Sequence, residues 1–176
     1  MRLRHLVGAA LAFVLTTPAA AQYSSTLPQF NGTFASSAPW PSFSVGQFGG
    51  TPTSNITFAQ ISGTFGNSDF ATSTGAVDVK LDGILVAQCV VNAPCWNGGG
   101  PYNWSYTFAP SEYSIFADGF ANLTADQTAG FVVRLGPTQL TIRYDQQTVV
   151  PEPSTYALLA TGLVGIVAVA RKRQQA

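Results

Sequence analysis

The chain carries little charge. Asp, Glu, Lys and Arg make up 9% of its 176 residues, with eight bases and eight acids. Most of the bases lie near the two ends, so that residues 22–150 hold only Lys80, Arg134 and Arg143 as bases. Binding to nucleic acid needs clustered Lys and Arg beside the phosphates. The sparsely charged, mildly acidic central part therefore argues against a nucleic-acid partner.

Histidine is almost absent. The single one, His5, lies in the N-terminal segment, which leaves the central part without Ser-His-Asp or Cys-His catalysis and without the commonest zinc ligand. Paired carboxylates could still serve a glycosidase, but Asp78 and Asp82 fit a solvated strand and its turn. Asp118 and Asp126 could bind calcium with loop carbonyls, although no D-x-D-x-D loop with a distal Glu surrounds them. We expect no enzymatic activity, no metal and no cofactor.

The N-terminus is typical of a secretory signal. Arg2 and Arg4 precede the apolar stretch Leu6–Leu15, and Ala19–Ala21 offers a small-residue cleavage site before Gln22. The apolar stretch is too short for a membrane anchor. We therefore predict a signal helix, removed with residues 1–21, and an exported body.

Only two cysteines occur, Cys89 and Cys95. An even pair in an exported chain predicts a disulfide, and the spacing differs from the C-x-x-C of redox proteins. The same loop continues into Trp96, Asn97 and three glycines. Trp96 and Asn97 are candidate contacts for a sugar ring; alternatively, Trp96 covers an edge of the fold.

Alternation of apolar and polar residues dominates residues 55–149. The strand expected at Val77–Leu81 ends in Asp82-Gly83, which suits a type I′ hairpin turn. Tyr102–Phe108 alternates aromatic with polar residues, which places Trp104 in the core, and Phe131, Val133 and Leu135 form a further apolar series. Short strands separated by Gly and Asp turns predict an all-β fold, a single immunoglobulin-like or jelly-roll β-sandwich.

Residues 22–54 are rich in Ser, Gly, Pro and Phe, which favours extended chain and turns. One interpretation is a flexible spacer with exposed aromatics. The other, which we favour because many exposed Phe rings would be sticky, is that Phe30, Phe34, Phe43 and Phe48 pack on the core.

The C-terminal segment has three parts, Pro151-Glu152-Pro153, the apolar run Tyr156–Ala170 and the bases Arg171-Lys172-Arg173. As a helix the run would span roughly 22 Å, short of the ~30 Å hydrocarbon core, and snorkelling bases would close part of the gap. We predict a transmembrane helix at 156–170 whose basic end stays cytoplasmic.

This order of parts resembles the PEP-CTERM tail of Gram-negative bacteria. The resemblance implies that exosortase, a membrane-embedded transpeptidase, processes an inner-membrane precursor at the sorting motif Pro151, Glu152 and Pro153. It also implies that the mature protein reaches the cell surface or the extracellular polysaccharide matrix.

The body carries a second resemblance. Residues 77–86, followed by Trp104–Phe108 and Ala117–Ala125, are similar to the bacterial immunoglobulin-like repeats of surface proteins. The resemblance implies a β-sandwich, here in one copy.

Together these features divide the chain into a signal peptide (1–21), a Ser/Gly/Pro-rich segment (22–54), a β-sandwich (55–149) and a sorting segment (150–176). The expected function is that of an exported, non-catalytic structural or adhesive protein of the cell surface. The alternative is a carbohydrate-binding module that acts on extracellular polysaccharide.

Overall fold

The computed structural model describes residues 19–67, 74–97, 101–146 and 153–173. The chain divides into two compact units, and Ala20–Gln146 forms the body. The helix α2 (Pro153–Arg173) belongs to the other unit. The predicted signal peptide falls almost wholly on residues 1–18, outside the described part.

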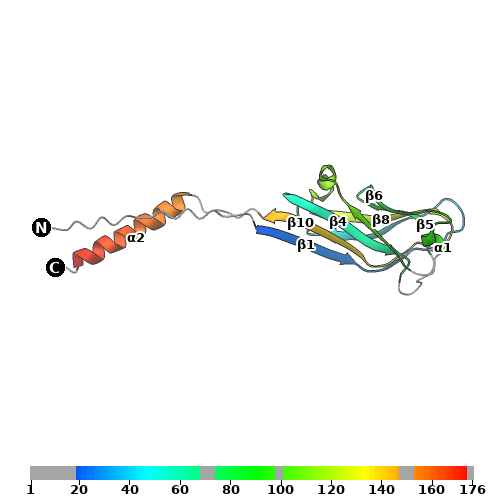
Figure 1. Ribbon diagram of the computed structural model, residues 1–176, viewed down its shortest axis with the longest axis horizontal. Coiled ribbons are helices and arrows are strands. Elements are labelled where there is room, and N and C mark those ends of the chain that lie inside the picture. Colours follow the sequence, from blue (N-terminus) through cyan, green and yellow to red (C-terminus); the bar gives the residue numbers. More distant parts are fainter. Residues whose placement is uncertain (1–18, 68–73, 98–100, 147–152, 174–176) are drawn as a thin grey trace. The chain divides into compact units, whose positions relative to one another are not determined.

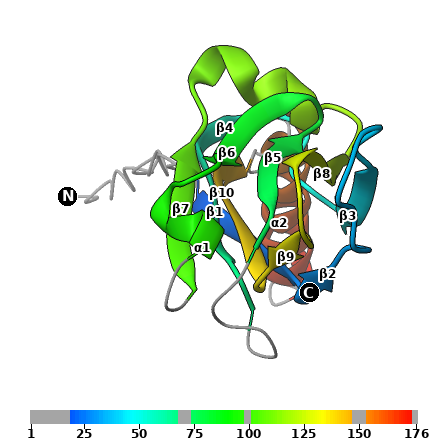
Figure 2. The same ribbon diagram turned by 90° about the vertical axis from the view of Figure 1, so that its right-hand side faces the viewer.

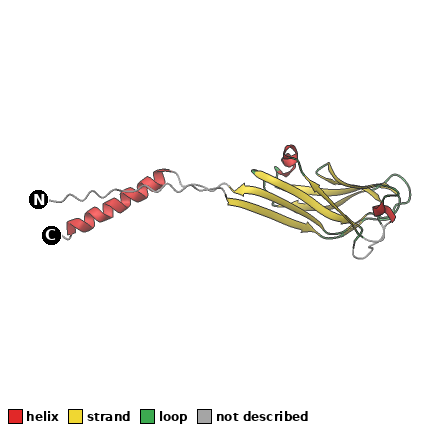
Figure 3. Ribbon diagram, viewed as in Figure 1, coloured by secondary structure: helices red, strands yellow, loops and turns green. Residues whose placement is uncertain are grey.

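Two sheets make up the body (Figures 1 and 3). The six-stranded sheet has the order β1 (Ala19–Leu27), β10 (Thr138–Gln146), β4 (Ile56–Phe65), β9 (Arg134–Leu135), β2 (Phe30–Asn31), with β7 (Tyr102–Thr107) also paired to β4. The four-stranded sheet has the order β3 (Ser42–Gly49), β8 (Phe120–Ala129), β5 (Ala76–Leu81), β6 (Ile84–Cys89). In the end-on view of Figure 2, the strands β3 and β7 lie on opposite sides of the body. The body is thus all-β and resembles a β-sandwich, as the alternation predicted.

The core lies between the inner faces of the two sheets. The two-residue period gives β4 buried side chains at Ala59, Ile61 and Phe65, and the facing strand β5 buries Val77 and Val79. Each fully buried aliphatic or aromatic side chain contributes about 1.5–3 kcal/mol of burial free energy. Alternation in the sequence therefore translates directly into the two-sided strands observed.

The hairpin β5–β6 turns where the sequence predicted. Leu81 pairs with Ile84, and the two central residues Asp82 and Gly83 have φ of 44° and 84°. Positive φ at both positions is the signature of a type I′ turn, which matches the twist of the flanking strands.

The body begins earlier than the predicted boundary at residue 55. The Ser/Gly/Pro-rich segment supplies β1, β2 and β3, and it belongs to the same compact unit as the rest. Phe48 is fully buried, and Phe30 and Phe43 pack against the core, whereas Phe34 is 62% exposed. Alternation is hidden here because the register of β3 shifts between Ser44 and Gly46.

Trp104 fills the core less completely than predicted. It is half-buried at the inner face of β7, directly opposite Gly63 of β4, and its ring centre lies 6.1 Å from that of Phe65. A Cβ at Gly63 would lie 2.6 Å from Cζ2 of Trp104, so the indole occupies the space that a side chain would take.

Both connections of the body leave from one end. β1 begins and β10 finishes at the same end of the sandwich, and the short helix α1 (Pro94–Asn97) lies at the other (Figure 1). The helix α2 contains the apolar run 156–170. Among the residues described, no helix is long and apolar enough to span a membrane.

Candidate contact surfaces and sorting segment

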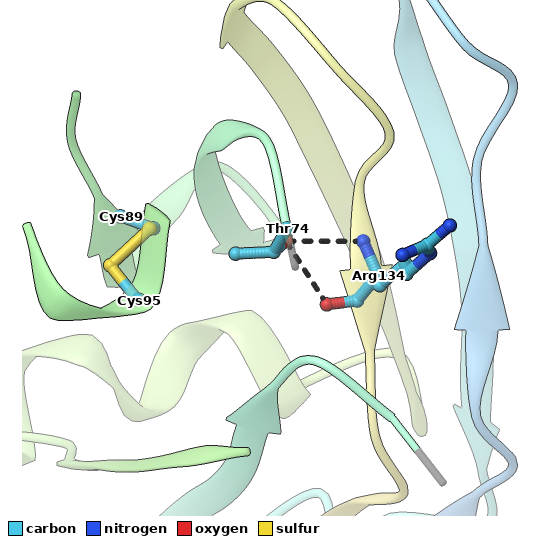
Figure 4. Close-up of a disulfide and its surroundings, with 4 residues drawn as sticks. All are labelled: Thr74, Cys89, Cys95 and Arg134. Atoms are coloured by element: carbon cyan, nitrogen blue, oxygen red, sulfur yellow. Dashed lines mark hydrogen bonds between the residues drawn. A yellow bond between two sulfur atoms is a disulfide. The ribbon is translucent and has the colours of Figure 1, made fainter. Parts of the chain in front are cut away.

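A disulfide fixes the loop that carries α1. Cys89, the buried last residue of β6, is bonded to Cys95 in α1, with the Cα atoms 5.9 Å apart. The structure therefore joins the two cysteines that the sequence paired. Close by, Thr74 Oγ1 donates a hydrogen bond to the Arg134 carbonyl (3.3 Å) and accepts one from the Arg134 N–H (3.2 Å) (Figure 4). These bonds tie the chain before β5 to β9 beside the disulfide.

Three aromatic side chains form what we call the aromatic end, Phe34, Trp96 and Phe131. The rings of Trp96 and Phe131 meet edge to face with centres 5.6 Å apart, and Phe131 meets Phe34 in the same way at 6.3 Å. Phe34 is 62% and Phe131 57% exposed, while Trp96 is half-buried against the core. The cluster therefore combines an anchored indole with two exposed phenyl rings.

Phe131 is held in an unfavourable backbone conformation. Its φ is +77°, a region that costs a residue with a side chain about 1–2 kcal/mol. The Phe131 N–H donates to the Ala35 carbonyl at 2.9 Å. The buried amide of Gln127 places Nε2 within 3.2 Å of Ala35 O, 3.1 Å of Ala129 O and 2.7 Å of Phe131 O. This network fixes the exposed ring between its two aromatic neighbours.

The sequence did not reveal Phe131 as a surface residue. Its spacing from Val133 and Leu135 predicted one apolar face, and those two residues are indeed buried. Phe131 departs from that face because a left-handed residue reverses the direction of the side chain. Neither the positive φ nor the Gln127 network has a sequence signal.

The predicted sugar contact at Trp96 and Asn97 stays a prediction, because the structure describes only the Trp96 side chain. Trp96 is engaged with Phe131 and with the core, while Asn97 ends α1 and its side chain is outside the described part. The structure places Trp96 against Phe131, which in turn contacts Phe34. The exposed loop residues Val90 and Val91, 49% and 47% exposed, extend the apolar character of this loop.

A second surface is an open depression on the outer face of the six-stranded sheet. We call it the polar hollow. Its volume is about 570 Å³, and its lining comprises Thr26, Ser62, Gly63, Thr64, Asn103, Trp104, Ser105, Pro137 and Gln139. None of these nine residues is charged. The surface arises from cross-strand register, since β1, β4, β7 and β10 each contribute to it.

The outer face of the four-stranded sheet has a different character. Lys80 Nζ lies 2.7 Å from a carboxylate oxygen of Asp126, and the Ser42 hydroxyl donates to the same carboxylate. The hydrogen bonds from Lys80 and then Ser42 lower the pKa of Asp126, and the bond to Asp126 raises the pKa of Lys80. Both groups therefore stay charged at neutral pH, so Lys80 cannot serve as a base for the Ser42 hydroxyl.

The other acids considered as candidate sites serve local structure. Asp82 accepts a hydrogen bond from the Asn122 side chain at 3.0 Å, and Asp118 accepts one from the Phe120 N–H at 2.9 Å. Asp78 accepts one from Gln88 Nε2 at 2.8 Å. Within the described ranges, no three His, Cys, Asp or Glu side chains gather as metal ligands.

The sorting residues fall at the margin of the description. Pro151 and Glu152 lie outside it, and Pro153 is the first residue of α2. Arg171 and Arg173 are exposed in the last turn of that helix, while the Lys172 side chain is not described. Their predicted role as a membrane stop thus rests on the sequence.

Comparison with known proteins bears on this segment. Residues 149–173 match the PEP-CTERM protein-sorting motif. No curated protein matches the chain. The motif indicates export, sorting at a membrane and processing by exosortase. The chain therefore carries the PEP-CTERM sorting signal directly after the last strand of a β-sandwich-like body.

Proposed function

We propose that this protein is a non-catalytic, structural or adhesive component of the bacterial cell surface, retained in the extracellular polysaccharide matrix. The observation that carries the proposal is the position of the sorting motif. It starts at residue 149, three residues after β10 ends at Gln146. The body is thus exported cargo whose own surfaces must supply whatever contact retains it.

The aromatic end supports an adhesive role. It lies at the end of the sandwich with α1, opposite the end where the chain leads into the sorting segment (Figure 1). Phe34 and Phe131 expose rings that a solvated body would be expected to bury, and a costly φ at Phe131 is maintained to keep that ring in place. Strained, exposed residues held by a rigid network are typical of contact sites.

In the precursor, α2 would serve as the inner-membrane anchor if its bases snorkel to the interface and so compensate for its short apolar run, and Arg171, Lys172 and Arg173 would form its cytoplasmic stop. The apolar run and the basic end fit this role, with the bases held inside by the positive-inside rule. Replacing all three bases by Ser should impair retention and sorting of the precursor. Fractionation that finds the triple variant processed like the parent protein would contradict the topology.

The adhesive role is tested by retention in the matrix. A Phe34→Ser/Phe131→Ser variant should leave the matrix fraction of washed cells and appear in the medium, while sorting proceeds normally. The matched control is Phe120→Ser. Phe120 is also exposed (45%), but it is the first residue of β8, whereas Phe131 follows the last residue of that strand. Equal retention of the double variant and the control would remove the aromatic end from the account.

The second candidate function is a carbohydrate-binding module. The sequence suggested a sugar site at Trp96 and Asn97. The observation that favours this function is instead the polar hollow, whose uncharged polar lining suits the hydroxyl groups of a sugar. A purified protein that binds no glycan and is still retained in the matrix would favour the structural or adhesive role over this one.

A further inference from the structure

The shape of the polar hollow follows from one row of paired residues. Gln139 of β10 lies opposite Ser62 of β4, and Ser62 lies opposite Ser105 of β7. Two directly paired serines are the smallest side chains in this patch that still carry a polar group. Longer side chains flank them: the paired residues Thr64 and Asn103 also line the hollow, and the pair Gln60 and Thr107 lies next to its lining on the other side. The serines therefore form a floor and their neighbours the walls.

Hydrogen bonds fix side chains in and beside the lining. Gln60 Nε2 donates to Thr107 Oγ1 at 3.2 Å, and Gln139 Nε2 donates to Ser24 Oγ of β1 at 3.1 Å. On the inner side of the same strand pair, the indole of Trp104 occupies the space that a side chain at Gly63 would take. A rigid surface loses little conformational entropy when a ligand binds.

The lining offers both donors and acceptors without charge. Hydroxyls of Ser62 and Ser105 donate and accept, the Asn103 amide does both, and Gln139 keeps its carbonyl oxygen for a ligand. The nearest base on β10, Arg143, points its guanidinium at the Phe58 ring, 5.1 Å from the ring centre. A carboxylate or sulfate on a ligand would find no cation in the hollow to pair with.

The size also limits the ligand. A volume of about 570 Å³ lies within the roughly 300–1,000 Å³ typical of small-molecule sites, and the depression is open along its sides. A short stretch of a polymer can lie in it while the chain continues in both directions. Pro137 at the rim adds an apolar surface for the C–H groups of a sugar ring.

We infer that the polar hollow is a binding site for a neutral polysaccharide. The inference rests on the proposed location in the matrix, where such polymers are the abundant ligand. It also moves the sugar site from the Trp96 loop to the face of the six-stranded sheet.

The test uses the full-length protein, purified in a mild detergent, and native electrophoresis through gels that contain one soluble polysaccharide. Hydroxyethyl cellulose, galactomannan and dextran are the neutral probes, and polygalacturonate is the acidic one. We expect at least one neutral polymer to retard the protein and polygalacturonate to leave its mobility unchanged.

Two variants change the hollow and two matched controls change the other sheet. Ser105→Tyr fills the floor and Gln139→Ala removes part of the wall, and each should weaken the retardation about tenfold or more. The control Ser44→Tyr likewise replaces an exposed serine on a strand that has one neighbouring strand. The control Gln47→Ala likewise removes one side-chain hydrogen bond, from Gln47 Nε2 to Asn122 at 2.8 Å. Both controls should bind like the parent protein, and thermal melts verify that all four variants fold.

Three outcomes would overturn the inference. Retardation abolished by Trp96→Ala but unaffected by the hollow variants would return the sugar site to the loop. Equal retardation by polygalacturonate would remove the restriction to neutral sugars. Binding to none of the neutral polymers would leave the hollow without its ligand, while the structural or adhesive role would still be judged separately, by matrix retention in cells.

Discussion

At Gly63 a missing side chain decides how a tryptophan packs. The indole of Trp104 lies where the Cβ of any other residue would be, and Thr138 Oγ1 lies 3.0 Å from the same point. Trp104 is half-buried, so its contribution to stability depends on this one close contact as much as on the core. Two residues from different strands thus behave as one packing unit.

Gly63→Ala should therefore lower the free energy of unfolding by about 1–3 kcal/mol, because the new methyl group clashes with the indole. In a Trp104→Ala background the same change should cost less, since the clash with the indole is gone and only the 3.0 Å approach to Thr138 Oγ1 remains. Urea denaturation of the four proteins in this cycle measures the coupling. Gly49→Ala is the control, because a Cβ there meets Phe120 at an ordinary 3.6 Å. Additive effects of the two changes would contradict the packing unit.

Asp126 and Lys80 make stability depend on pH. The hydrogen bond from Lys80 lowers the pKa of Asp126 below its ordinary 3.8, so the stabilisation is present above that value and is lost as the pH falls through the folded-state pKa. Lys80 has a raised pKa, so its stabilisation is present below 10.5 and is lost at higher pH. The pair is partly exposed, which keeps both effects small.

In the variants Asp126→Asn and Lys80→Gln, the free energy of unfolding should fall less steeply below about pH 4. Either change removes the ion pair that lowers the pKa of the carboxyl group. Urea unfolding at a series of pH values between neutral and acidic compares each variant with the parent protein. An acid limb as steep in both variants as in the parent would show that this pair does not control it.

At the scale of elements, the disulfide and the strained loop act on the same end of the body. Cys95 is followed directly by Trp96, so the bond between β6 and α1 also positions the indole that contacts Phe131. Gln127 holds the other partner of that contact. The aromatic end is therefore built from three separate segments: the disulfide fixes the one with Trp96, and hydrogen bonds to the Ala35 carbonyl join the other two.

Replacing both cysteines by Ala should lower the free energy of unfolding by about 2 kcal/mol, since the bond closes a short loop. Denaturation with and without reductant measures it, and the reduced parent protein should behave like the variant. Mass spectrometry after alkylation under native, non-reducing conditions supplies the direct check: two alkylated thiols would show that the bond does not form.

Phe131→Gly and Phe131→Ala separate strain from side-chain contact. Both remove the ring, but only Gly adopts a φ of +77° without penalty, so the Gly variant should be more stable than the Ala variant by about 1–2 kcal/mol. Thermal and urea unfolding compare the two. Equal stabilities, or a more stable Ala variant, would mean that the loop does not keep this conformation.

The elements differ in how far the sequence predicts them. The strands β5 and β7 alternate apolar and polar residues, and the Asp82-Gly83 turn has a conformation that few other residue pairs adopt, so these elements and the return strand β6 were predicted. The strand β1 was missed because it holds few large apolar residues, and β3 because its alternation breaks where the register shifts between Ser44 and Gly46. At Gly46 a Cβ would lie 2.9 Å from the end of the Leu27 side chain, which would have to shift to make room.

The candidate surfaces were harder to predict than the fold. The polar hollow depends on Ser62 and Ser105 being opposite each other on β4 and β7, which only the register reveals. The aromatic end depends on contacts among residues 34, 96 and 131. The sorting motif was predicted fully because its parts are contiguous in the chain. Features made of contiguous residues can be predicted from one sequence, whereas pairings between distant residues cannot.

At the scale of the whole molecule, the sorting segment and the body have separate roles. The PEP-CTERM segment specifies export and exosortase processing, and the β-sandwich-like body carries the surfaces that would act after sorting. The two roles make different demands on the chain. Exosortase must recognise the sorting segment, whereas the body must fold on its own.

The intact mass of the mature protein tests this division most directly. We predict that surface material from cells with a working exosortase contains a chain that begins at Gln22 and ends near Pro151-Glu152-Pro153, with the disulfide between Cys89 and Cys95 intact. In cells without exosortase the same chain should keep its C-terminal segment. Mature surface protein that retains residues 156–170 despite a working exosortase would contradict the account.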